Sequence, residues 1–139
     1  MLVNPSGADN RAGRARVLKG SQVGRITTHV LDLAHGKPGA GMTVTLYRRA
    51  GDAYEKIASA STNADGRCDA PLAEGAALGK GRYRLVFAAA AYFRANGVAL
   101  PDPPFVDEIV LDFGISDVAA HYHVPLLVSP WSYSTYRGS

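Results

Sequence analysis

Three parts of this chain carry side chains that can accept, donate or orient protons. His29 lies in the segment ITTHVLDL, His121 and His123 lie in HYHVPLLVS, and the chain ends in YRGS, residues 136–139. A neutral imidazole can take up a proton near pH 7, and a guanidinium offers a planar fork of hydrogen-bond donors. The same side chains could equally lie exposed on the outside of a sheet, so their spacing alone leaves the function open.

Other kinds of site find little support in the sequence. His121 and His123 are two residues apart and could bind zinc, which favours imidazole nitrogen, but no obvious third ligand accompanies them. The sequence contains no Gly-x-Ser-x-Gly elbow, phosphate loop or dinucleotide fingerprint. Its carboxylates are scattered and form no pair of the glycosidase kind. We therefore expect neither a metal site nor a cofactor.

The elements that must position these side chains are short runs rich in β-branched and aromatic residues, separated by Gly, Pro and Asp clusters. This pattern predicts an all-β sandwich of about eight strands, with one short helix in the alanine-rich segment 88–97. The predicted strands are Arg25–Leu33, Met42–Arg49, Tyr54–Ser59, a short one near Arg67–Asp69, Gly81–Ala88, Phe105–Phe113, His121–Ser129 and Ser132–Tyr136.

Alternation along the strands separates the histidines from the predicted core, because successive strand residues point to opposite faces of a sheet. The predicted core faces consist of Ile26, Thr28 and Val30 in one strand and of Tyr122, Val124, Leu126 and Val128 in another. The opposite faces consist of Thr27, His29 and Leu31, and of His121, His123, Pro125 and Leu127. In the last strand Ser132, Ser134 and Tyr136 share one side. These faces are free to line a surface that another subunit covers.

Length and composition predict one domain with an extension. At 139 residues and 47% hydrophobic, the chain can bury one core of ordinary size. We predict a flexible basic N-terminal extension over residues 1–23 and the domain over residues 24–139. No apolar run approaches the roughly 20 residues of a membrane span, and the start of the chain does not have the pattern of a secretory signal. We expect a cytoplasmic protein that binds neither nucleic acid nor membrane.

Three segments together resemble a known family. ITTHVLDLAHGKPGAGMTVTLYRR, NADGR and HYHVPLLVSPWSYSTYRGS are similar to segments of the 5-hydroxyisourate hydrolases, the transthyretin-related enzymes of purine breakdown. The resemblance covers residues 25–139, and YRGS is its most specific motif. It implies a transthyretin-like two-sheet β-sandwich that assembles into a homotetramer, with the sites in a channel between dimers.

The resemblance also implies an activity and a set of site residues. The activity is cofactor-free hydrolysis of the N1–C6 bond of 5-hydroxyisourate to 2-oxo-4-hydroxy-4-carboxy-5-ureidoimidazoline, a step of urate degradation. The implied catalytic residues are His29, Arg67, His123 and Tyr136, and the implied substrate-binding residues are Ser134, Arg137, Gly138 and Ser139. Which of the two histidines is the general base stays open.

Two functions of other classes remain as alternatives. A transthyretin-like carrier would share the sandwich and bind a small ligand without catalysis. The resemblance favours the enzyme, because the carrier lacks the counterparts of His29, Arg67, His123 and the YRGS tail. A structural adhesion module is the other alternative, but such a module would more often be secreted and would have no use for a polar tail of fixed position.

Overall fold

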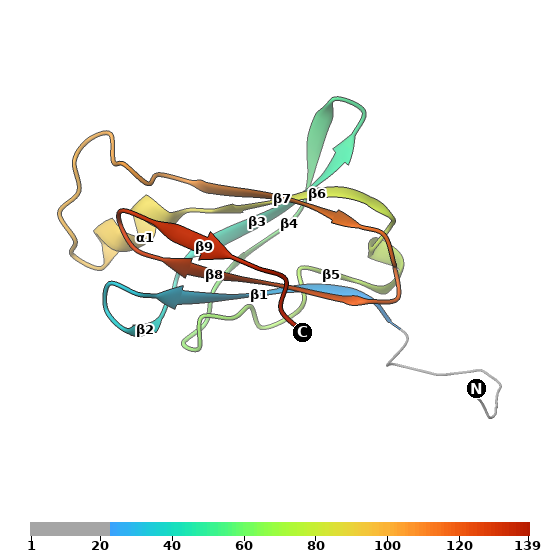
Figure 1. Ribbon diagram of the computed structural model, residues 1–139, viewed down its shortest axis with the longest axis horizontal. Coiled ribbons are helices and arrows are strands. Elements are labelled where there is room, and N and C mark those ends of the chain that lie inside the picture. The colour runs from blue at the N-terminus through green and yellow to red at the C-terminus, as the bar shows by residue number, and fades with distance from the viewer. Residues whose placement is uncertain (1–22) are drawn as a thin grey trace.

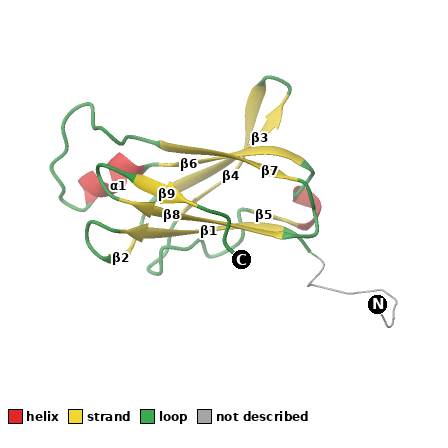
Figure 2. Ribbon diagram, in the orientation of Figure 1, coloured by secondary structure: helices red, strands yellow, loops and turns green. Residues whose placement is uncertain are grey.

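The computed structural model describes residues 23–139, which form two β-sheets packed face to face (Figures 1 and 2). In one sheet the strand order is β2 (Lys37–Pro38), β1 (Arg25–Asp32), β8 (His121–Val128) and β9 (Tyr133–Thr135), and β5 (Ala73–Glu74) also pairs with β1. In the other sheet the order is β4 (Ala53–Ser61), β3 (Thr43–Ala50), β6 (Gly81–Phe87) and β7 (Ile109–Ile115). One α-helix, α1 (Ala89–Ala95), and a 3-10 helix at Gly75–Ala77 complete the described elements. The predicted two-sheet sandwich with one short helix is confirmed.

The core lies between the inner faces of the two sheets. In β1 every second residue is buried, and Ile26 and Val30 have no exposed surface. Leu46 of β3 and Leu85 of β6 are equally buried and belong to the same hydrophobic cluster. Burial of each such side chain stabilises the fold by about 1.5–3 kcal/mol. The residues between them on β1 therefore belong to the outer face of the five-stranded sheet.

Two strand predictions need correction. Residues 67–69 form no strand, because the Asn63 side-chain oxygen accepts hydrogen bonds from the backbone N–H groups of Asp65 and Arg67 and holds this segment in a turn. The strand predicted from Phe105 begins at Ile109, because the residues before it connect to the helix: the Asp107 carbonyl accepts a hydrogen bond from Ala90 in α1. The short strands β2 and β5 were not predicted.

A buried carboxylate fixes α1 to the end of β1. Asp32 is 1% exposed and accepts hydrogen bonds from the Tyr92 hydroxyl at 2.7 Å and from Nδ1 of His35 at 2.6 Å. Burial alone would raise the pKa of Asp32, but the hydrogen bonds from Tyr92 and His35 outweigh it and lower the pKa. His35 therefore has a structural partner at the far end of β1, away from the other histidines.

The extension predicted over residues 1–23 lies, apart from Val23, outside the described residues, and it stays a prediction. Within residues 23–139, no helix is both long and apolar enough to cross a membrane.

Candidate functional site

The parallel pairing of β1 with β8 brings the strand histidines onto one surface. In this pairing Thr27 lies opposite His123, and His29 lies opposite Pro125. Val124, Leu126 and Val128 of β8 are buried, whereas His121 and His123 are half-buried on the other face, as is His29 on β1. The alternation predicted from the sequence is thus present in both strands except at Pro125, which was assigned to the outer face and is buried. Because strands in a sheet lie about 5 Å apart, these side chains share one patch on the outer face of the five-stranded sheet.

The NADGR segment brings Arg67 to the same patch. The Gly66 carbonyl accepts a hydrogen bond from the backbone N–H of Val30 at 2.8 Å, and Arg67 forms an isolated antiparallel bridge with His29. Gly66 has a φ of 77°, and a Cβ at this position would collide with the Val30 carbonyl oxygen. A glycine is therefore required where the turn approaches β1, and the next residue in the chain, Arg67, is held beside His29.

The same turn determines which nitrogen of His29 can accept a proton. Nε2 of His29 lies 2.9 Å from the backbone carbonyl oxygen of Asp65. A carbonyl oxygen can only accept a hydrogen bond, so Nε2 must carry the hydrogen. In neutral His29 the free lone pair is therefore on Nδ1, which can accept a hydrogen bond from water or from a ligand N–H group.

The C-terminal residues run along β8 and reach His123. Ser134 of β9 pairs with Leu127, and the Thr135 hydroxyl donates to the Pro125 carbonyl at 2.7 Å. Further along, the Gly138 backbone N–H donates to the His123 carbonyl at 2.8 Å. A Cβ on Gly138 would lie 2.6 Å from Cδ2 of the His123 ring, so only glycine fits here without displacing the imidazole.

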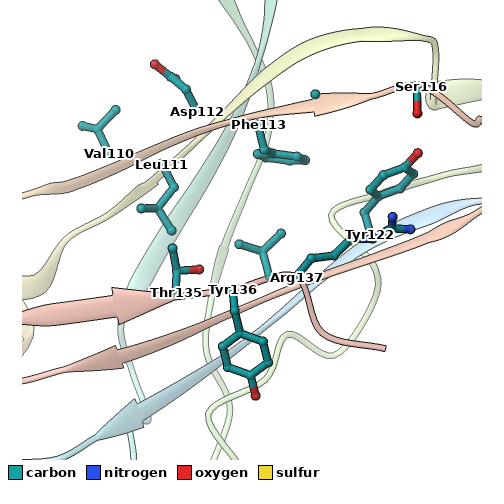
Figure 3. A pocket seen from close by; sticks show the side chains of 11 residues that line it. Val110, Leu111, Asp112, Phe113, Ser116, Tyr122, Thr135, Tyr136 and Arg137 are labelled. Carbon is teal, nitrogen blue, oxygen red and sulfur yellow. The ribbon is translucent and has the colours of Figure 1, made fainter.

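Arg137, for which the family resemblance implies substrate binding, makes no side-chain hydrogen bond to His29 or His123 within the described residues. Its guanidinium carbon lies 4.4 Å from the centre of the Tyr122 ring, and its Nη2 donates to the His121 backbone carbonyl at 3.3 Å. Tyr122 belongs to the buried face of β8. Figure 3 shows Arg137 extending toward Tyr122, in a cavity of about 410 Å³ that is also lined by Phe113 and Ser116 of the facing edge. Arg137 therefore attaches the tail to Tyr122 on the buried face of β8, opposite the face that carries the histidines.

The remaining tail residues predicted for the site are exposed in the single chain. The Tyr136 ring is 62% exposed and points away from Phe113 and Tyr122 in Figure 3. Ser134 and Ser139 are exposed as well. Ser134 pairs with Leu127 and so lies on the face of the sheet that carries the histidines. The described chain by itself places His29, Arg67, His123 and Gly138 together. Among the described residues, the side chains of Ser134, Tyr136 and Ser139 make no hydrogen bond to this group.

The charges around His123 favour its neutral form. Burial is the main cause that lowers the pKa of His123. The guanidinium of Arg67 lowers it further, as do His121 and His29 whenever they are protonated. The pKa of His121 is also lowered, by burial first and then by Arg25 and Arg137. His123 is therefore neutral at pH 7 and can accept a proton.

Sequence reasoning missed Thr27 as a member of this site, and it placed His121 on the same face as His123 without giving it a role in the reaction. Oγ1 of Thr27 lies 2.8 Å from Nδ1 of His123 and 2.7 Å from Nε2 of His121. The available signal was the position of Thr27, two residues before His29 on the same strand face. Within residues 23–139, His, Cys, Asp and Glu side chains form no group of three that could hold a metal ion.

Comparison with known proteins gives one family. A sequence model of the HIUase/Transthyretin family matches residues 26–138. The 5-hydroxyisourate hydrolase of Ralstonia nicotianae is 58% identical over 117 residues, which are 84% of this chain and 100% of that protein.

Solved structures agree with this result. The 5-hydroxyisourate hydrolase of Klebsiella pneumoniae has a TM-score of 0.70 and 36% identity, and the match covers 84% of this chain and 99% of that one. An (S)-allantoin synthase has a TM-score of 0.79 and 42% identity, with 84% of this chain covering 44% of that chain. Sea bream transthyretin in complex with thyroxine has a TM-score of 0.74 and 26% identity, covering 82% and 94% of the two chains.

Proposed function

Since this chain belongs to the HIUase/transthyretin family, we propose that it is a 5-hydroxyisourate hydrolase whose active site is the patch formed by His29, Arg67 and His123. The observation that carries this proposal is that three segments far apart in the sequence converge there. β1 supplies His29, the NADGR turn supplies Arg67 and β8 supplies His123. A proton acceptor and a guanidinium on one surface are what hydrolysis of an activated carbonyl requires.

In the proposed reaction His123 is the general base. Its lowered pKa keeps it neutral, so it can take a proton from water while the water oxygen bonds to C6 of the substrate. The Arg67 guanidinium stabilises the negative charge that develops on the C6 oxygen. The N1–C6 bond then breaks, the proton passes from His123 to N1, and the new carboxyl group ionises to give 2-oxo-4-hydroxy-4-carboxy-5-ureidoimidazoline.

His29 and the tail have supporting roles in this mechanism. Nδ1 of His29 accepts a hydrogen bond from the water or from a substrate N–H group, because its Nε2 is already bonded to the Asp65 carbonyl. Gly138 packs against the His123 ring and limits its rotation. Tyr136, Ser134 and Ser139 would enclose the substrate only once a second subunit covers this face.

Assembly into a homotetramer is part of the proposal. β7 and β9 are the outermost strands of their sheets in the described chain, and every residue of β9 is exposed. Such edges present unpaired backbone groups to another copy of the chain. Edge-to-edge pairing would join two chains into a dimer, and two dimers would then enclose the histidine faces in a channel. We expect the tetramer to act in the cytoplasm, without a nucleic-acid or membrane partner.

The sandwich itself does not distinguish the enzyme from a carrier, because a transthyretin solved with thyroxine has the same fold. The test is to follow the ultraviolet absorbance of freshly generated 5-hydroxyisourate with and without the purified protein. We expect its decay to accelerate in proportion to protein concentration. Decay at the uncatalysed rate, together with saturable binding of the unchanged compound, would favour the carrier.

The pH dependence of kcat/KM should report the lowered pKa of His123. The reaction needs neutral His123, so activity falls as the pH drops through this pKa, and we expect the acid limb to have its midpoint below 6.5, the ordinary histidine value. Arg67→Gln removes a positive charge that lowers the pKa, so the midpoint should move upward. The measurement is a pH profile of kcat/KM for both proteins.

Arg67→Lys is the matched control for this profile. It keeps the charge and loses the planar fork, so kcat/KM should fall by at least about tenfold while the midpoint stays in place. A Gln variant with the wild-type midpoint would show that Arg67 does not act on His123.

A further inference from the structure

One threonine hydroxyl lies between the two histidines of β8. Thr27 faces His123 across the parallel β1–β8 pair, and its Oγ1 lies 2.8 Å from Nδ1 of His123. The same oxygen lies 2.7 Å from Nε2 of His121. Both distances are those of hydrogen bonds, and all three side chains are partly buried on the outer face of the sheet. A single hydroxyl therefore connects His123 with a histidine that has no role in the proposed reaction.

Three arrangements of the hydrogens are compatible with this chain of bonds. A hydroxyl has one hydrogen and two lone pairs, so it either donates to one imidazole and accepts from the other, or accepts from both and directs its hydrogen elsewhere. If Thr27 donates to His121, then Nδ1 of His123 carries a hydrogen and its Nε2 keeps the lone pair. If Thr27 donates to Nδ1 of His123, the hydrogen of neutral His123 is on Nε2, and that nitrogen cannot take a proton from water.

We propose that Thr27 is a positioning residue: its hydroxyl accepts from Nδ1–H of His123 and donates to Nε2 of a neutral His121, which keeps the lone pair of His123 on Nε2. This inference rests on the proposed function, in which His123 is the general base. Nδ1 of His123 is engaged by Thr27, so Nε2 is the ring nitrogen that remains for the water. The Cδ2 atom next to Nε2 is packed against Gly138, which limits rotation of the ring.

The surroundings of His121 support the neutral form that this arrangement needs. A protonated His121 would carry hydrogen on Nε2 and could only donate to Thr27, which would leave Nδ1 of His123 as the neighbouring acceptor for the Thr27 hydrogen and so favour the inactive arrangement. Arg25 pairs with His121 across the β1–β8 register, and Arg137 donates to the His121 carbonyl. Burial and these two cations lower the pKa of His121. On β5, Glu74 pairs with Arg25 and not with His121.

The test compares Thr27→Val, which keeps the shape and loses the hydroxyl, with Thr27→Ser, which keeps the hydroxyl. We expect kcat of the Val variant to fall by at least about tenfold with little change in KM, because part of the contribution of a general base is lost. The Ser variant should stay close to wild type. Thr45→Val is the control, because Thr45 is a partly buried threonine of the other sheet, bonded only to Ser59.

A spectroscopic measurement distinguishes this role from a structural one. With 15N-labelled histidine at a pH where both rings are neutral, NMR should show the hydrogen of His123 on Nδ1 in the wild-type protein and at least partly on Nε2 in Thr27→Val. Wild-type His123 with its hydrogen on Nε2, an unchanged tautomer in the Val variant, or an unchanged kcat would each overturn the proposal. If Thr27→Val does not fold, the tautomer in the wild type and in Thr27→Ser decides.

The spectroscopic result does not depend on the substrate. If the wild-type protein failed to hydrolyse 5-hydroxyisourate, the proposed function would fall. The tautomer of His123 in the wild type and in Thr27→Val would still show whether Thr27 holds it.

Discussion

His123→Ala is expected to lower kcat/KM by at least about a hundredfold, the scale on which a general base contributes to a reaction. The variant should still fold, because His123 is half-buried on the outer face of β8 and does not belong to the core. The substitution removes the imidazole that accepts the proton. The hydrogen bond from the Gly138 N–H to the backbone carbonyl of residue 123 does not involve the side chain and can still form. Steady-state kinetics with 5-hydroxyisourate and a thermal melt measure the two effects separately.

His35→Ala is the matched control, since it removes the histidine that lies away from the patch. His35 donates to the buried Asp32 carboxylate, so we expect a loss of about 1–2 kcal/mol of unfolding free energy. The activity at low temperature should stay near the wild-type value. His123→Ala should therefore lose activity and keep its stability, whereas His35→Ala should lose stability and keep its activity. Wild-type turnover in His123→Ala would remove His123 from the mechanism.

Deleting residues 136–139 is expected to lower kcat/KM by about a hundredfold or more, because small displacements of catalytic groups have effects of this size. The deletion removes Gly138 from the His123 ring and removes the Arg137 contact with Tyr122. A tag appended after Ser139 should also reduce activity. The core should be little affected, since no residue of this tail is part of it.

Gly138→Ala tests the same contact with one added carbon. The new Cβ would lie 2.6 Å from the His123 ring and must displace it, so kcat should fall while the melting temperature stays near that of wild type. Gly114→Ala is the control, because a Cβ there meets no atom within 4 Å and the backbone does not have a positive φ. Size-exclusion chromatography shows whether each variant keeps the wild-type assembly. If Gly138→Ala and the tagged protein both retain full turnover, the tail is not part of the site.

The local pattern of the sequence determined which side chains leave the core. Alternation in β1 and β8 placed His29 and His123 opposite the buried residues, and the structure has both there. The Asp65–Gly66 pair indicated a turn, and Gly66 has the positive φ that favours glycine. These properties depend on neighbouring residues only, so periodicity and turn chemistry are sufficient to predict them. The family resemblance then named the residues, but it gave no contacts between them.

Tertiary structure alone decided that the site residues of β1, β8 and the NADGR turn come into contact. Thr27 and His123 are 96 residues apart, and their pairing depends on the register of β1 against β8, which the whole core sets by packing. Likewise the NADGR turn reaches His29 because Gly66 docks on Val30, and no local pattern predicts that contact. Arg137 shows the same limit, since no local pattern predicted the contact of its guanidinium with Tyr122. Alternation fixes a face within one strand, whereas distant strands meet only where their buried side chains pack together.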